Sequence, residues 1–130
     1  MIHEHEFEFR VRYQETDAQG RVHHANYLSY FEQGRIELLR AAGFSYRELE
    51  EQGIMLVVAE ASCRYFQGAR YDDLLRLKTT TVRCKGVRIE HRYELFLDDE
   101  LIVEGRTVVA CVDRSGKVCR LPDWLRIDDR

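Results

Sequence analysis

The chain opens with an alternation of hydrophobic and charged residues. Between about residues 6 and 13 every second side chain is apolar, and these side chains share one face: Phe7, Phe9, Val11 and Tyr13. A period of two predicts a strand that is buried on one side. Residues 14–26 are mostly polar and include Gly20, so we expect them to form a loop.

From about Tyr27 the apolar residues recur every three or four positions, and this period continues to Ala42. The period predicts a long helix with one buried face. Asn26 is suited to the N-cap, and Gly43 to the left-handed residue that ends the helix. Gly34 lowers helix stability by about 1 kcal/mol relative to alanine. We therefore expect the helix to approach a sheet closely at this glycine.

A second, short helix is predicted after Ser45, because Ser45 and Glu48 have the spacing of a capping box and Gly53 ends the segment. The remainder consists of strand-like runs at about residues 54–66, 74–84, 87–97 and 101–113. Short turns join the last three runs, which predicts an antiparallel meander. One long helix on one face of an antiparallel sheet is an α+β architecture.

The run that begins at Ile54 is apolar and uncharged at its start. Edge strands are normally paired, covered or charged. If this strand lies at a sheet edge, pairing with the same strand of a second copy covers it. We therefore expect a homodimer.

Composition narrows the class of protein. A chain of 130 residues with 45% hydrophobic residues has the size of one domain, to which we assign residues 1–130. The net charge of −3 provides no global attraction to nucleic acid. No apolar run approaches the ~18 residues of a membrane span. The first residues lack the apolar stretch of a signal peptide, so we expect a cytoplasmic protein.

The sequence contains no strong metal or nucleotide motif. None of the cysteines forms a C-x-x-C pair, and we expect ordinary thiols rather than a zinc site or a disulfide framework at Cys63, Cys84, Cys111 and Cys119. Adjacent histidines such as His23 and His24 rarely share a metal, so no metal is predicted. The motifs of serine hydrolases, P-loop NTPases and Rossmann domains are absent from the sequence.

The junction between the first loop and the long helix holds the best candidate chemistry. A helix N-terminus presents unpaired backbone N–H groups, which can stabilise a carbonyl oxygen that becomes negative during attack. Asp17 lies in the loop that leads into this terminus, shortly before His24. A carboxylate beside such donors can attack a carbonyl or deprotonate a water that does so.

Each candidate residue also has an interpretation in which it serves only the fold. Asp17 stands in the sequence TDAQG, which is typical of a turn, and from the residues alone the turn interpretation is favoured. Glu32 can act as a second acid, but a glutamate three residues before Arg35 more often forms an ion pair. His91 lies on an apolar strand face, where we expect a core histidine whose hydrogen bonds are satisfied.

The polar loop and the residues after it form the run Tyr13-x-x-Thr16-Asp17-x-x-Gly20-x-Val22-x-His24-x-Asn26-Tyr27. This run resembles the signature of the 4-hydroxybenzoyl-CoA thioesterase family in its YbgC-type branch. Further matching positions are Phe31, Glu32, Arg35, Tyr65, Ala69, Arg70, Asp72, Asp73, Leu75, Leu121 and Pro122. The resemblance covers essentially the whole chain.

This resemblance implies a hotdog fold, in which a five-stranded antiparallel sheet wraps a long central helix. It also implies dimers joined along one sheet edge, often paired into homotetramers, with the active site at the dimer interface. Carried over by motif position, Asp17 is the catalytic carboxylate and the His24 backbone N–H polarises a thioester carbonyl. The His24 side chain would assist as an acid, base or orienting group, and Tyr13 would shape the pocket.

The expected substrate is an acyl-CoA, with no separate cofactor because CoA is part of the substrate. We place the acyl pocket against Tyr27, Tyr30 and Phe31, together with aromatic residues of the partner chain. Cations suited to the phosphates of CoA occur at strand ends and turns: Arg64, Arg70, Arg83, Lys85 and Arg88. For each of them a solvated basic face is the alternative.

Departures from the family pattern leave the acyl group open. They are Gln14, Glu15, Gly34 and Gly68. Two alternative functions also stay open: a non-catalytic hotdog module that binds a CoA or acyl-carrier-protein thioester, and an acyl-carrier-protein thioesterase. Release of free thiol from acyl-CoA distinguishes catalysis from binding.

Overall fold

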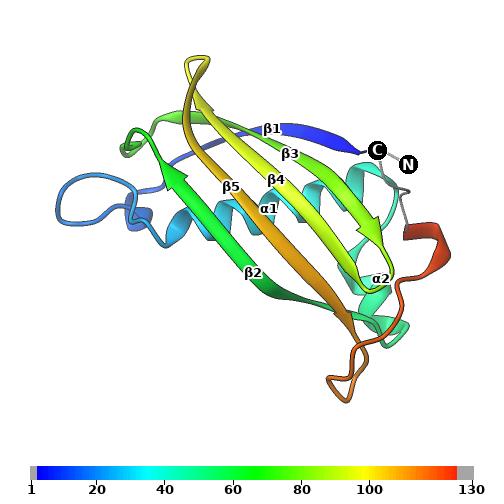
Figure 1. Ribbon diagram of the computed structural model, residues 1–130. Coiled ribbons are helices and arrows are strands. Elements are labelled where there is room, and N and C mark those ends of the chain that lie inside the picture. Colours follow the sequence, from blue (N-terminus) through cyan, green and yellow to red (C-terminus); the bar gives the residue numbers. More distant parts are fainter. Residues whose placement is uncertain (1–2, 126–130) are drawn as a thin grey trace.

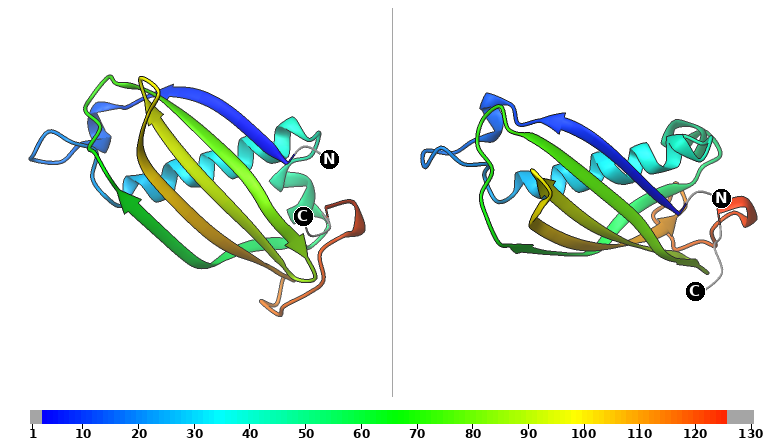
Figure 2. Two further views of the ribbon diagram at one scale, coloured as in Figure 1. Left: turned by 45° about the horizontal axis from the view of Figure 1, so that its top comes forward. Right: turned by 90° about the horizontal axis from the view of Figure 1, so that it is seen from above.

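A five-stranded antiparallel sheet curves around one long helix in the computed structural model, which describes residues 3–125 (Figures 1 and 2). The strand order is β1-β3-β4-β5-β2. The elements are β1 (Glu4–Arg10), η1 (Tyr13–Glu15), α1 (Asn26–Ala41), α2 (Tyr46–Glu51), β2 (Met55–Tyr65), β3 (Leu74–Lys85), β4 (Arg88–Leu97), β5 (Glu100–Val112) and η2 (Asp123–Leu125). The predicted α+β architecture, with a central helix against five strands, is confirmed.

The core lies between α1 and the sheet. The helix buries one stripe of side chains, which includes Tyr27, Tyr30, Phe31, Leu38 and Leu39. They pack against alternate residues of β3, β4 and β5, whose burial follows the period of two expected for strands that are covered on one face.

Gly34 allows the close approach that the sequence predicts. A Cβ atom at this position would overlap the Thr79 hydroxyl and would lie 2.7 Å from Cδ2 of Leu77, both on β3. Any side chain here would push α1 away from the sheet, which explains a glycine in the middle of a helix.

Two local predictions at the start of the chain are wrong. The strand ends at Arg10, and Tyr13 belongs to the short 3-10 helix η1, where its side chain is 76% exposed. The reason is local: the Arg12 N–H donates to the Glu15 carboxylate at 2.8 Å, and this bond turns the chain out of the strand. Ala25 rather than Asn26 is the N-cap of α1.

The predicted helix ends and turns are confirmed elsewhere. Gly43 and Gly53 have φ values of +92° and +81° after α1 and α2, as left-handed terminators do. The Ser45 hydroxyl accepts a hydrogen bond from the Glu48 N–H at 3.2 Å and so caps α2. The Asp98-Asp99 turn joins β4 to β5 with both residues at positive φ.

Strand β2 lies at an edge of the sheet, which is the condition on which the expectation of a dimer depends. Most of its residues are exposed in the single chain, including the large apolar side chains of Met55, Val57, Val58 and Tyr65. A long apolar edge of this kind favours pairing with another strand.

No disulfide joins the cysteines in the described part of the chain; Cys84 and Cys111 are buried, and Cys63 and Cys119 are half-buried. Within residues 3–125, no group of three or more His, Cys, Asp or Glu side chains is arranged to hold a metal ion. No helix in this part of the chain is long and apolar enough to cross a membrane.

Candidate functional site

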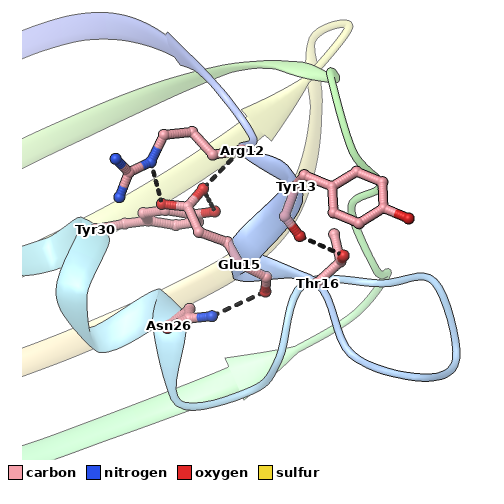
Figure 3. Close-up of polar contacts among 6 residues, drawn as sticks. All are labelled: Arg12, Tyr13, Glu15, Thr16, Asn26 and Tyr30. Carbon is pink, nitrogen blue, oxygen red and sulfur yellow. Dashed lines mark hydrogen bonds and ion pairs between the residues drawn. The ribbon is translucent and has the colours of Figure 1, made fainter.

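A network centred on Glu15 fixes the polar loop against the first turn of α1 (Figure 3). The Glu15 carboxylate accepts hydrogen bonds from the Arg12 backbone at 2.8 Å and from the Tyr30 hydroxyl at 2.9 Å. The Glu15 carbonyl accepts from the Asn26 side chain at 2.8 Å and from the His23 N–H at 2.9 Å. Glu15 therefore connects η1 to α1 through both its side chain and its backbone carbonyl.

Asp17 begins a tight turn inside this loop. Its Oδ1 atom accepts from the N–H groups of Gln19 at 2.9 Å and Arg21 at 3.4 Å, and its carbonyl accepts from Gly20 at 2.9 Å. The turn interpretation of Asp17 is thus confirmed for one carboxylate oxygen. Among the described residues, no hydrogen bond engages Oδ2 of Asp17.

The same turn occurs a second time, at the other end of the molecule. Asp113 accepts from the N–H groups of Ser115 at 2.9 Å and Lys117 at 3.0 Å, and the Asp113 carbonyl accepts from Gly116 at 2.9 Å. Asp113 does not line the cavity described next. It therefore provides an internal reference for an aspartate that serves only the turn.

Asp17 lines a cavity of about 220 Å³ between the loop, the start of α1 and the end of β2. The other lining residues are Gln19, Arg21, Val22, His24, Tyr27, Tyr65, Gln67 and Gly68. The cavity thus brings together Asp17 and His24 of the loop and Tyr27 of α1. A half-buried carboxylate beside a helix N-terminus has the components required for attack on a carbonyl.

Two hydrogen bonds hold the start of α1 without using the backbone N–H of His24. The Tyr65 hydroxyl donates to the His24 carbonyl at 3.0 Å, and the Ala25 N–H donates to Nδ1 of His23 at 3.1 Å. No hydrogen bond within residues 3–125 engages the backbone N–H of His24. Burial, together with the nearby Cys63 thiol, raises the pKa of Tyr65, so its hydroxyl stays protonated and can donate.

Three residues predicted near the reacting group lie elsewhere in the single chain. Tyr13 projects into solvent with its ring against Tyr71, at a centroid distance of 5.3 Å. Tyr30 and Phe31 are fully buried in the core and do not reach the Asp17 cavity. Tyr27 is 2% exposed and contributes to both core and cavity.

The five predicted cations separate into different regions. Arg70 lines a second cavity of about 470 Å³, which adjoins the Asp17 cavity because both share Arg21, Gln67 and Gly68. Arg64 pairs with Glu104 at 3.5 Å on the outer face. A third cavity, of about 310 Å³, is lined by Glu60, Arg83, Lys85, Arg88, Glu90, Arg106 and Val108, several of which flank the β3–β4 turn. This turn lies at the end of the sheet away from the loop of residues 14–26 (Figure 1).

Sequence reasoning missed three residues of this site. Arg21 lines both adjoining cavities, Tyr65 orients the start of α1, and Glu15 anchors the loop. Tyr65 belongs to the family pattern and its position at the end of a strand was a usable signal. Nothing in the local sequence distinguishes Glu15 from a solvated glutamate, because its partner Tyr30 lies on the next element.

Of the structural roles predicted for Glu32 and His91, the structure shows the first and contradicts the second in part. Glu32 forms the predicted ion pair with Arg35, at 3.9 Å. His91 is buried as predicted, but its Nδ1 atom has no hydrogen-bond partner among the described residues, so the prediction of a satisfied histidine is wrong. The side chains around His91 are mainly apolar, and no described group forms a hydrogen bond with its Nδ1 atom.

Comparisons with known proteins find a family that matches most of the chain. The family model of the thioesterase-like superfamily matches residues 11–127. The acyl-CoA thioesterase YbgC of Haemophilus influenzae is 39% identical over 108 residues, which are 82% of this chain and 79% of that protein. The acyl-CoA thioester hydrolase YbgC of Escherichia coli O6:H1 is 33% identical over 80% of this chain and 78% of its own. Among solved structures, the DHNA-CoA thioesterase of Staphylococcus aureus has a TM-score of 0.89 and 31% identity, covering 93% of this chain and 85% of that one.

Proposed function

Because the chain belongs to the thioesterase-like superfamily, in its YbgC-type branch of thioester hydrolases, we propose that it hydrolyses acyl-CoA to the free acid and CoA, with Asp17 as the catalytic carboxylate. The family resemblance in the sequence and the hotdog fold that it implies are both confirmed by these relatives. The acyl group and the role of each site residue are parts of the proposal.

One observation carries the proposed mechanism: Asp17 and the N-terminal end of α1 line the same cavity. The thioester carbonyl binds with its oxygen toward the His24 N–H. Asp17 either removes a proton from a water that attacks the carbonyl carbon or attacks that carbon itself, and in the second case water then cleaves the resulting anhydride. The oxyanion of the tetrahedral intermediate is stabilised by the His24 N–H and the helix dipole. When the C–S bond breaks, the thiolate of CoA leaves and is protonated.

The direct test is release of free thiol from a panel of short aliphatic, long aliphatic and aromatic acyl-CoAs, with acyl-carrier-protein thioesters as a second panel. We expect thiol release from at least one acyl-CoA with multiple turnovers. Binding of acyl-CoA without thiol release would instead favour the non-catalytic module, and turnover restricted to the second panel would favour the acyl-carrier-protein enzyme.

The proposed enzyme is a homodimer in which two β2 edges pair antiparallel. The support is the exposed apolar edge formed by Met55, Val57 and Val58. Such pairing sets the beginning of one β2 beside the end of the other. In each chain the β3–β4 turn lies toward the beginning of β2 (Figure 1). The second copy thus brings its cavity lined by Arg83, Lys85 and Arg88 to the end of the dimer that holds Asp17 of the first.

Replacing Val58 with lysine is expected to convert the dimer to monomer, because a charge on an edge strand opposes edge-to-edge pairing. Thiol release should fall with dissociation, since the site is completed by the second copy. Analytical ultracentrifugation measures the association state. Val118→Lys is the matched control, because Val118 is also an exposed valine, at 63%, but lies outside β2. A Val58→Lys protein that dimerises like the control would exclude this edge as the interface.

Arg70 is proposed to bind a phosphate of CoA beside the Asp17 cavity. Arg70→Ala should raise KM about 10- to 100-fold at unchanged kcat, since loss of a hydrogen bond to a charged group costs roughly 1.5–3 kcal/mol and Arg70 does not line the Asp17 cavity. Steady-state kinetics with acyl-CoA and with the acyl-pantetheine analogue, which lacks the nucleotide phosphates, provides the check. The KM for the analogue should not change. Arg47→Ala, an exposed arginine on α2, serves as the control, and an equal KM change in both variants would remove Arg70 from the site.

A further inference from the structure

A second polar site lies between the C-terminal half of α1 and the sheet, apart from the Asp17 cavity. It is a cavity of about 40 Å³ with a mainly apolar wall, which comprises Leu38, Leu39, Ala42, Leu56, Cys84, Ile89 and Leu125. Its polar lining consists of Arg35, Tyr46, Thr81 and His91. A water needs at least about 10–15 Å³ of such space, so this cavity has room for a group of a few atoms.

Arg35 brings a positive charge to this cavity from α1. Its side chain is only 9% exposed, whereas the carboxylate paired with it, Glu32, is 64% exposed and lies 3.9 Å away. Its contact with the Tyr93 hydroxyl is long, at 3.5 Å. A buried cation is destabilising by several kcal/mol unless a close counter-charge compensates it. Within residues 3–125 the Arg35 charge is therefore only partly balanced.

His91 provides a second, unpartnered group on the opposite wall, from β4. It is 6% exposed, and its Nδ1 atom has no hydrogen-bond partner in the described part of the chain. Burial, and secondarily the charge of Arg35, lowers the pKa of His91 to about 3. The imidazole is therefore neutral at pH 7 and carries one N–H donor, which can be on either ring nitrogen.

The polar lining has the composition of an anion site. A guanidinium offers five N–H donors, the neutral imidazole one, and the hydroxyls of Thr81 and Tyr46 one each. No carboxylate lines the cavity among the described residues. Charge and donors therefore converge on a small space that is otherwise apolar, where electrostatic attraction is stronger than in water.

We propose that this cavity binds a small monovalent anion, of the size of chloride or formate, between the Arg35 guanidinium and the His91 imidazole. The anion compensates the buried charge and joins α1 to β4 through their polar side chains. This site is independent of the proposed hydrolysis, because it shares no residue with the Asp17 cavity.

The first test measures the melting temperature while chloride or formate replaces gluconate at constant ionic strength. Gluconate is too large for the cavity, so we expect a saturable rise in melting temperature with chloride, formate or both, in the millimolar range. Arg35→Met and His91→Phe should abolish the rise. Thr79→Val is the matched control, because Thr79 also has a buried hydroxyl without a partner but does not line the cavity. Asp17→Asn should keep the rise whether or not the protein is a thioesterase.

The second test needs no variant and so holds even if Arg35→Met does not fold. Crystals of the unchanged protein soaked in bromide should show an anomalous peak within hydrogen-bonding distance of Arg35 and His91. Density that fits only water overturns the proposal. A bromide peak without any saturable stabilisation by chloride or formate also overturns it, because the ion is then bound only at the concentration of the soak.

Discussion

Asp17→Asn is expected to lower kcat for acyl-CoA hydrolysis by about 10²- to 10⁴-fold, the range that a positioned acid or base contributes. Asparagine has nearly the same shape and keeps an oxygen that can accept from the Gln19 and Arg21 N–H groups, so the turn should persist. It can neither take a proton from water nor act as a carboxylate nucleophile. Thiol release under saturating substrate measures the effect, and circular dichroism and ultracentrifugation verify fold and dimer.

The duplicate turn at Asp113 supplies the control for this experiment. Asp113→Asn makes the same chemical change in a turn with the same backbone hydrogen bonds, remote from the cavity; Asp113 accepts one further bond, from the Ser115 hydroxyl. It should leave kcat unchanged. Equal activity of Asp17→Asn and the unchanged protein would restrict Asp17 to its turn role, whereas equal loss in both variants would trace the effect to turn geometry.

Gly105→Ala is expected to give the largest loss of stability for one added methyl group. A Cβ at this position of β5 would overlap Cε2 of Phe31 and lie 2.6 Å from its Cζ atom. The ring cannot withdraw, because its other face stacks on Tyr93 at a centroid distance of 4.4 Å. Overpacking of a filled core lowers the free energy of unfolding by about 1–3 kcal/mol. Urea denaturation gives this value as a change of midpoint at constant slope.

A double-mutant cycle with Phe31→Leu identifies the clash. The smaller leucine leaves room for the alanine, so Gly105→Ala should be less destabilising in the Phe31→Leu background than in the unchanged protein, with a coupling energy of about 0.5–3 kcal/mol. Strictly additive losses would show that the aromatic ring is not the group with which the new methyl collides.

Individual hydrogen bonds overrode the periodic pattern in specific places. The alternation up to Tyr13 extends the predicted strand too far, because the bond between the Arg12 N–H and the Glu15 carboxylate turns the chain. Asn26 has a suitable side chain for a helix N-cap, but this side chain donates to the Glu15 carbonyl and fixes the loop. In both cases the deciding partner belongs to the network around Glu15, which includes Tyr30 on α1. Periodicity describes one element at a time and carries no information on such partners.

The sequence by itself determined most of the elements and the family to which the chain belongs. Alternation and three-to-four spacing predicted the strands and the long helix, Gly34 predicted a close helix–sheet contact, and the motif around Asp17 predicted the family. These features depend on residues that are near each other in the chain, so the sequence contains them directly.

Only the tertiary structure decided which side chains meet. It brings Tyr65 from the end of β2 to the start of α1, makes Arg21 part of two adjoining cavities, and encloses Arg35 with His91. Tyr30 and Phe31, which the sequence suggested for the acyl pocket, became core residues instead. The physical reason is that the curvature of the sheet and the position of α1 across it set these distances, and both arise from packing of the whole core rather than from any local pattern.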